Sequence, residues 1–400
     1  MNSNITPIKN PSSKLGMWLS AILIVLLVGS VYISQLIFQE IAESFNIDHV
    51  YASRVFSLSC FFYAISFFIY GPLSDRVATK FLVLFGSIGT IVCLILSVQV
   101  QSFNLYLIIM SLIGFFAASV PSALFAYTAK NTPNDKLAQA MGLMISASII
   151  GIIFSRSIVA IMTDKSSWQY AFVVYAAFII LASVFVPMGI KSNASNHSGI
   201  RITETYLLAG KLLLNKQVNI FLLVGFILFF VYLGLSSFLT IYLKGAPFYL
   251  SSTTLGWLNF AGMSAVIGAV ITGKLSQKIS IQKLLPLYLF CVMAAVIIIG
   301  FSTHLLLIAL GIFALFFFVF GIQPIVISML NQIVPVSSRG AISSLYLLSC
   351  LAGGSIGSYI LGILYAKLNW DGLIFTCIIL AMMNIALALL GIKLTRAKEN

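Results

Sequence analysis

Twelve long, unbroken apolar runs constrain this chain more than any other feature of its sequence. A helix needs about 20 apolar residues to cross the hydrocarbon core of a bilayer, whereas membrane β-barrels alternate apolar and polar residues. The sequence therefore predicts an all-α membrane protein with 12 transmembrane helices. The runs lie at residues 17–39, 52–72, 81–100, 104–127, 137–162, 169–190, 219–243, 254–273, 284–302, 304–329, 340–365 and 371–392.

Charge is scarce, which excludes several other classes of protein. Asp, Glu, Lys and Arg make up 8% of the chain, against about 25% in soluble domains. Disorder is excluded because disordered chains combine low hydrophobicity with high charge. The five cysteines lie inside apolar runs and the three histidines are isolated, so neither disulfides nor a metal site is expected. No cofactor and no enzymatic activity are expected either.

The distribution of Lys and Arg predicts the orientation of the chain. Cytoplasmic loops of membrane proteins hold the excess of these residues. With the N-terminus inside, 17 of the 22 cations lie in inner segments, and only Lys165, Lys244 and Lys367 lie in outer loops. Both termini are therefore expected in the cytoplasm. The predicted segments are a cytoplasmic N-terminus (1–16), a first six-helix bundle (17–190), a cytoplasmic linker (191–218), a second bundle (219–392) and a cytoplasmic tail (393–400).

The two predicted bundles repeat at a constant offset of 202 residues. This shift takes Gly71 to Gly273, Gly151 to Gly353 and Trp168 to Trp370. Because six spans is an even number, the two halves have the same orientation. Parallel halves related by an axis along the membrane normal are one design of transporter, with the substrate near mid-membrane between them.

The loop between the second and third spans carries a recognisable motif. Gly71, Leu73, Ser74, Asp75, Arg76 and Lys80 match six positions of the pattern G-x-L-[SA]-D-R-x-G-R-[KR]. The loop resembles the signature of the major facilitator superfamily at the same place in the chain. The resemblance implies that Asp75 and Arg76 help to close and release the cytoplasmic side, as a conformational switch loop. The alternative interpretation is a basic cytoplasmic turn whose charges only reflect the orientation of the chain in the membrane.

Other segments resemble one branch of this family, the bacterial efflux permeases of the drug/proton-antiporter and sugar-efflux type. The end of the first span, residues 32–47, is similar to the branch pattern Q-P-L-L-P-x-I-A-x-x-F-x-I without its two prolines. Residues 140–172 resemble its fifth span and the following loop, and residues 247–256 the start of its eighth span. The resemblance implies proton-linked efflux.

Arg156 is the most informative single residue in the spans. We place it about five residues from the outer end of the fifth span, and an intramembrane charge suggests a substrate site or pathway. Alternatively, its long side chain snorkels to the outer interface. The spans hold no convincing buried acid, so the substrate is expected to be anionic or neutral. Glu40 is assigned to the outer loop and is a candidate for proton coupling.

Polar and small residues inside the spans complete the set of candidates. Tyr32, Gln35, Asn259 and Gln323 are candidate cavity residues, although such side chains often only bond neighbouring helices. Gly151, Gly353 and Gly357 mark close helix packing. We expect the helices that carry these glycines to slide against partners across the two halves.

The expected function is secondary active transport of a small organic solute across the inner membrane by alternating access, most simply as proton-linked efflux. The alternatives are uptake of a nutrient, organic anion or metal chelate by the same machinery and, more remotely, a non-transporting membrane sensor. The expected partners are the substrate, protons as the coupling ion and the lipid bilayer, with no nucleic acid, and the protein is expected to be monomeric. The expected location is the bacterial inner membrane.

Overall fold

The structure is a computed structural model of the 400-residue chain. It describes residues 14–74, 77–132, 134–190, 210–276, 278–335 and 339–399. Every regular element in these ranges is a helix, as the all-α prediction requires.

The helices fall into two groups along the chain. The first half contains α1 (Lys14–Ser30), α2 (Phe38–Phe45), α3 (His49–Ala52), α4 (Arg54–Leu73), α5 (Thr79–Ser97), α6 (Phe103–Ala117), α7 (Ser119–Asn131), α8 (Asn134–Lys165), α9 (Trp168–Val184) and α10 (Val186–Gly189). The second half contains α12 (Lys216–Lys244), α13 (Ser252–Asn259), η1 (Phe260–Met263), α14 (Ser264–Leu275), α15 (Ile281–Phe301), α16 (Leu305–Ile333) and α17 (Arg339–Glu399).

Each apolar run of the sequence coincides with helical structure. In the described part of the chain, nine helical segments are long and apolar enough to cross a membrane, while α1 and α9 are shorter apolar helices. One of the nine extends over residues 345–395 and contains a break at Asn369, whose backbone is not helical (φ 56°). The run at 17–39 ends in a series of turns over residues 31–36, before α2.

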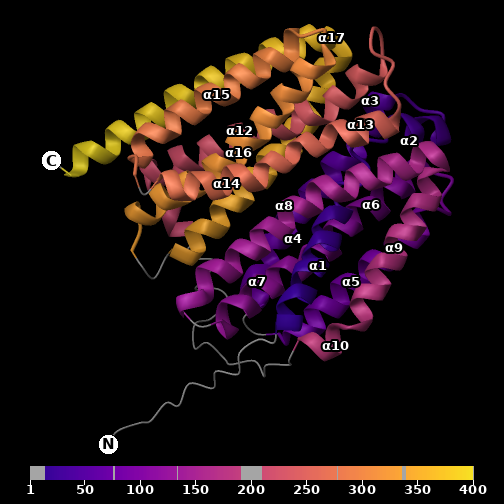
Figure 1. The fold of residues 1–400 in the computed structure, drawn as a ribbon, viewed down its shortest axis with the longest axis horizontal. Coiled ribbons are helices and arrows are strands. Elements are labelled where there is room, and N and C mark those ends of the chain that lie inside the picture. The colour runs from indigo at the N-terminus through magenta and orange to yellow at the C-terminus, as the bar shows by residue number, and fades with distance from the viewer. Residues whose placement is uncertain are drawn as a thin grey trace, which may run out of the picture.

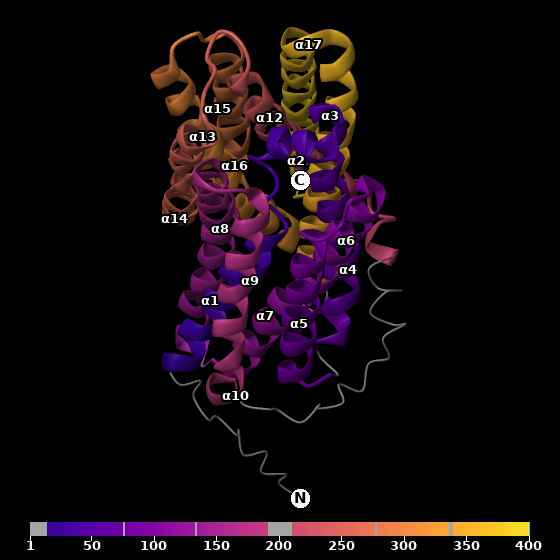
Figure 2. The ribbon, with the colours of Figure 1, turned by 90° about the vertical axis from the view of Figure 1, so that its right-hand side faces the viewer.

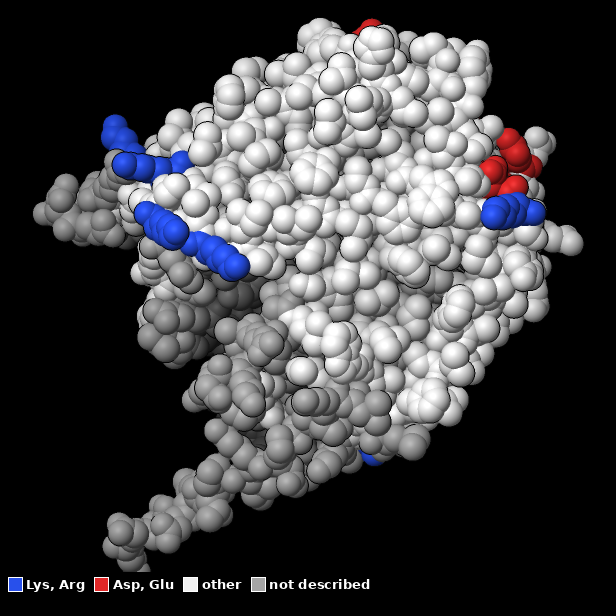
Figure 3. All heavy atoms as spheres, in the orientation of Figure 1, with Lys and Arg blue, Asp and Glu red and all other residues white. Residues whose placement is uncertain are grey.

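The two halves lie side by side, the first in indigo to magenta and the second in red to yellow (Figure 1). Charged side chains on the face shown in Figure 3 gather near its ends, with a wide band of uncharged surface between them. Large apolar side chains such as Phe81, Ile108 and Leu181 are more than half exposed, which suits contact with lipid. The structure therefore has the surface of a multi-pass membrane protein.

The predicted glycines allow close helix packing, but within each half. A Cβ on Gly151 would lie 2.5 Å from the carbonyl oxygen of Val25 in α1. On Gly353 and Gly357 it would lie 2.1 and 2.4 Å from carbonyl oxygens of α12. The glycines themselves therefore face α1 or α12 of their own half, whereas the helices that carry them, α8 and α17, contact partners across the halves, α13 and α4.

The two halves meet mainly through α4 with α17 and through α8 with α13. The helix α13 packs broadly against α8, whereas α14, the next segment of the same span, barely contacts it. The short helices α2 and α3 lie against the second half at the α13 end of the molecule (Figure 2). The halves therefore close together at the α13 end, and the pair α8 and α14 separates toward the other end, where α1 starts and α17 finishes (Figure 1).

Candidate functional site

Arg156 on α8 is the only charged side chain buried in the described part of the chain, with 1% of its surface exposed. Its Nη1 donates a hydrogen bond of 2.5 Å to Oε1 of Gln35, which lies in the turns between α1 and α2. Cζ of the guanidinium lies over the Phe316 ring, 5.3 Å from the ring centre. The side chain therefore points into the protein and does not snorkel to a surface.

A chain of hydrogen bonds leads from Arg156 across the two halves. Gln35 donates from Nε2 to Oγ of Ser237 on α12, at 2.9 Å. Ser358 on α17 donates to the same Ser237 oxygen, at 3.3 Å. We call Arg156, Gln35, Ser237 and Ser358 the polar chain.

The polar chain follows the 202-residue repeat. Gln35 and Ser237 are 202 residues apart, and so are Arg156 and Ser358. The bond from Arg156 to Gln35 in the first half thus occupies the same place as the bond from Ser358 to Ser237 in the second. Equivalent residues of two related halves contact each other only where the axis between them passes. The axis predicted from the sequence repeat therefore runs between Gln35 and Ser237.

A second pair of contacts obeys the same symmetry. Ser355 on α17 donates to the carbonyl oxygen of Ser57 on α4, at 2.7 Å. Asn259 on α13 donates to the carbonyl oxygen of Ile153 on α8, at 3.1 Å. Adding 202 turns Ser57 into Asn259 and Ile153 into Ser355. The two interfaces between the halves are thus built from equivalent positions.

A pocket opens beside Arg156, between α8 and the second half. Its walls are mostly apolar and come from α12, α13 and α16, with three polar uncharged side chains among them. The residues around it are Leu36, Arg156, Ser236, Leu239, Thr240, Leu243, Leu255, Leu258, Asn259, Ile312, Leu315 and Phe316. The cavity holds about 30 Å³ in this conformation. Its lining, apolar with few polar groups, is typical of a small-molecule site.

Arg156 has no carboxylate partner among the residues that the structure describes. The nine acidic residues of the chain all lie at or outside the ends of the apolar runs. Within the described residues, Nε and Nη2 of Arg156 have no hydrogen-bond partner. The hydroxyl of Tyr232 is near enough to interact with the guanidinium electrostatically, outside the geometry of a hydrogen bond. The pocket thus contains one positive charge that the protein does not neutralise.

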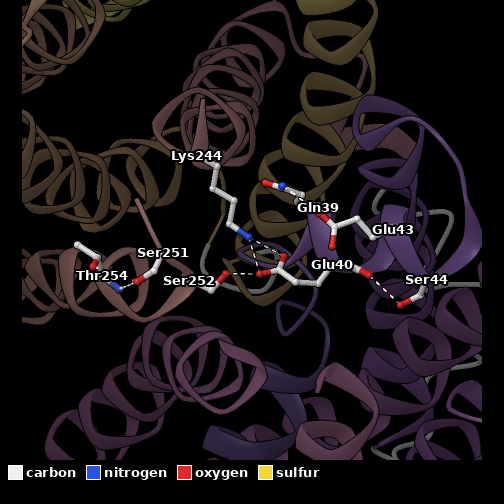
Figure 4. A network of polar contacts seen from close by, with 8 residues as sticks. All are labelled: Gln39, Glu40, Glu43, Ser44, Lys244, Ser251, Ser252 and Thr254. Atoms are coloured by element: carbon white, nitrogen blue, oxygen red, sulfur yellow. Dashed lines mark hydrogen bonds and ion pairs between the residues drawn. The ribbon is translucent and has the colours of Figure 1, made fainter. Parts of the chain in front are cut away.

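An ion pair near the pocket joins the two halves. Figure 4 shows this ion pair and its neighbours. Nζ of Lys244, at the end of α12, lies 2.5 and 2.6 Å from the two carboxylate oxygens of Glu40 on α2. Ser252, at the start of α13, also donates to Glu40. We call Glu40, Lys244 and Ser252 the latch. Leu36, Leu243 and Leu255 of the pocket wall lie one to four residues from its three members.

One sequence expectation is refined at the latch. Glu40, which we assigned to the outer loop, lies on the short amphipathic helix α2, which also carries Glu43 and buries Phe38, Ile41 and Ala42. Glu43 accepts a hydrogen bond only from Gln39 of the same helix in Figure 4, at 3.0 Å. Glu40 alone of the two therefore joins the halves.

The other cavity candidates are placed differently. The ring of Tyr32 is buried against Phe56, with ring centres 5.4 Å apart. Asn259 lines the pocket and also donates to Oγ of Ser157 at 2.7 Å. Gln323 is only half-buried, next to Pro324 in α16, and does not line the pocket. The structure thus brings Gln35, Arg156 and Asn259 together and leaves Gln323 apart.

The predicted switch loop is described in part. Gly71 and Leu73 lie in the last turn of α4, and Ser74 donates to the carbonyl oxygen of Gly71 at 2.6 Å. Lys80 lies in the first turn of α5. Asp75 and Arg76 lie outside the described residues.

Several residues of the site were not singled out from the sequence. Ser237 and Ser358 occupy the positions 202 residues after Gln35 and Arg156, so the repeat offset would have indicated both. Lys244 is one of three cations in the predicted outer loops, and its pairing with Glu40 required the fold. Among the described residues, no cluster of His, Cys, Asp and Glu has the composition of a metal site.

Comparison with known proteins gives consistent matches. The sequence model described as Major Facilitator Superfamily matches residues 18–348. The chain is 24% identical over 350 residues to the MFS-type transporter YybF of Bacillus subtilis, covering 86% of this chain and 85% of that protein. It is 23% identical over 244 residues to the multidrug resistance protein MdtG of Salmonella schwarzengrund, covering 59% of each.

A solved structure with the same fold is that of a bacterial homologue of the human lysosomal transporter Spinster, in an inward-facing and unoccupied conformation. Its TM-score is 0.76 at 15% identity, with 96% of this chain and 98% of that chain covered.

Proposed function

The chain belongs to the major facilitator superfamily and is a membrane transporter of that type, and we propose that it exports a small organic solute across the inner membrane in exchange for protons. The two six-helix bundles, at 17–190 and 219–392, would rock around the axis between Gln35 and Ser237. The single observation that supports this proposal is the polar chain, which joins the halves at that axis, with the pocket beside Arg156.

The latch supports alternating access. It joins α2 of the first half to α12 and α13 of the second, at the end where α8 and α13 pack closely. With the termini in the cytoplasm, this end faces outward, and the conformation is closed to the outside. Opening the pocket to the outside then requires the Glu40–Lys244 pair to separate, while the switch loop with Asp75 and Arg76 closes the opposite side.

Glu40 is our candidate for coupling export to protons. Its side chain is 23% exposed, so protons from the outside reach it, while it holds Lys244 across the halves. Protonation removes the negative charge that attracts Lys244 and weakens the latch. A proton arriving from the outside would thereby favour the outward-open state that releases substrate.

Direction and coupling can be tested together in cells. We would measure accumulation of radiolabelled organic acids, sugars and cationic dyes with and without the protein, and with and without a protonophore. Export predicts lower accumulation in cells that contain the protein, and proton coupling predicts that the protonophore abolishes the difference. Higher accumulation in those cells would establish uptake instead, and a difference that survives the protonophore would refute proton coupling. The role of Glu40 would be tested with Glu40→Gln. Glu43→Gln is the matched control, since the hydrogen bond that Glu43 accepts in Figure 4 comes from Gln39 of its own helix.

A further inference from the structure

One edge of the Arg156 guanidinium is buried beside the pocket and carries unpaired donors. Nη1 is occupied by Gln35, whereas Nε and Nη2 have no partner among the described residues. Nε–H and Nη2–H are parallel donors on the same edge of the planar group. Two parallel donors match the two oxygens of a carboxylate, which arginine binds in this bidentate way.

The charge of Arg156 makes the empty pocket unfavourable. A buried ion is stable only when it is paired and hydrogen-bonded, and the side chain is 1% exposed with no acidic neighbour. The acid nearest to the pocket along the chain, Glu40, is held by Lys244 and Ser252. A molecule that brings a negative charge into the pocket would therefore be stabilised by Arg156.

The rest of the pocket selects against further charge. Eight of the twelve residues around it are Leu, Ile or Phe, and Cζ of Arg156 lies over the ring of Phe316. The amide nitrogen of Asn259 is already engaged by the first half. A second charge on the ligand would thus be buried against hydrocarbon, which is costly.

We infer that the pocket binds a monocarboxylate with an apolar body, its carboxylate on the Nε–Nη2 edge of Arg156 and its body against the leucines and Phe316. This inference names the class of substrate. It rests on the proposed transport function only in taking the bound molecule to be the one that is transported. An inorganic anion would satisfy the charge but leave the apolar wall empty. A cation would meet the repulsion of Arg156 in a medium of low dielectric constant.

Binding to the purified full-length protein in detergent tests the inference without any transport step. We would measure equilibrium dissociation constants of four probes: 3-phenylpropanoate, its neutral amide, 3-phenylpropylammonium and succinate. We expect the monocarboxylate to bind at least roughly 10-fold more tightly than each of the others, since a bidentate charged bond is about twice as strong as a neutral one. Equal binding of the amide or the ammonium probe, or no binding of any probe to folded protein, would overturn the inference.

Two substitutions locate the binding at Arg156. Gln35→Glu places a carboxylate where an oxygen lies 2.5 Å from Nη1, so the protein would neutralise its own arginine. The affinity for 3-phenylpropanoate should fall at least roughly 10-fold while the amide is unaffected. Gln39→Glu is the control, because it adds the same charge on the exposed part of α2. Equal affinity in wild type and Gln35→Glu would refute the assignment.

Arg156→Lys keeps the charge and removes the fork, and we expect a loss of at least roughly 10-fold for the monocarboxylate. Wild-type affinity in a folded Arg156→Lys protein would refute the bidentate contact, and the selectivity of the wild-type protein remains decisive if this variant does not fold. Carboxylate binding without carrier-mediated movement in proteoliposomes would refute the proposed function and leave the inference standing. Transport of neutral or cationic solutes without carboxylate binding would refute the inference and leave the proposed transport function standing.

Discussion

Nε2 of Gln35 donates to Oγ of Ser237 at 2.9 Å, and the two residues occupy the same position in the two halves of the chain. This contact locates the axis between the halves at one hydrogen bond. It also shows where the symmetry is broken. At the next equivalent position, the first half supplies the guanidinium of Arg156 and the second supplies the hydroxyl of Ser358. A substrate on the axis would thus find its charge partner in one half only.

Ser237→Ala should shift the protein toward the state open at the α13 end. It removes the acceptor of Gln35 and with it a bond between the halves, and hydrogen bonds between membrane helices contribute about 0.6 kcal/mol. The open population should rise about threefold. Spin labels at Tyr170→Cys and Tyr249→Cys, two exposed positions near the latch, would report the distance. Ser358→Ala is the control, because its bond to Ser237 lies within the second half; an equal shift in both variants would contradict the prediction.

Glu40→Gln should open the same end more strongly. The Glu40–Lys244 pair is partly buried, with 23% and 9% of the side chains exposed, and a pair of this kind contributes up to about 1 kcal/mol. The same spin labels should show about a fivefold larger open population. Glu43→Gln should leave it unchanged, and the exchange Glu40→Lys with Lys244→Glu should restore closure. Identical distances in Glu40→Gln and Glu43→Gln would show that the latch holds nothing closed.

Arg156→Lys and Arg156→Ala should both lose most transport, by at least roughly 10-fold, while the protein folds normally. Lysine cannot replace the planar fork that meets a carboxylate with two bonds. Transport of the labelled substrate into proteoliposomes, at equal protein content, measures the effect. Full activity of Arg156→Lys, or robust export of quaternary ammonium dyes by the wild type, would count decisively against this pocket.

Reporter fusions after Lys80, at Asn196 and after Lys398 should all behave as cytoplasmic. The expectation follows from the charge rule, because the predicted topology puts 17 of the 20 cations in loops and tails on that side. A pair of reporters that are active on opposite sides of the membrane gives the measurement. Asn196 lies outside the described residues, and a periplasmic signal there would refute the division into six and six spans.

Asp75→Asn should depress transport strongly and leave expression nearly intact. The residue precedes α5 in the chain, and the N-cap residue of α5 is Ala78, whose methyl side chain cannot cap the helix. A negative charge near a helix start is stabilising. Transport and membrane abundance should be measured in the same vesicles. Wild-type transport at equal abundance would reduce the loop to a signal for topology.

The sequence by itself determined the class of fold and the relation between its halves. Unbroken apolar runs permit only helices in a bilayer, because every backbone polar group must then be satisfied within its own segment. The offset of 202 residues predicted equivalent halves, and the bond between Gln35 and Ser237 is its direct consequence. Arg156 could be singled out because a charge in an apolar run is rare and costly.

Only the tertiary structure decided what these residues contact. Glu40 and Lys244 are 204 residues apart in the sequence, and neither local propensity nor periodicity encodes such a pairing. The sequence grouped Gln323 with Asn259 as cavity candidates, whereas the fold lines the pocket with Asn259 and not with Gln323. The fold also turned Gly353 toward α12 of its own half. An apolar helix has no amphipathic stripe to show which face meets which neighbour, so in a membrane protein the partners of each face are chosen by packing, and packing exists only in three dimensions.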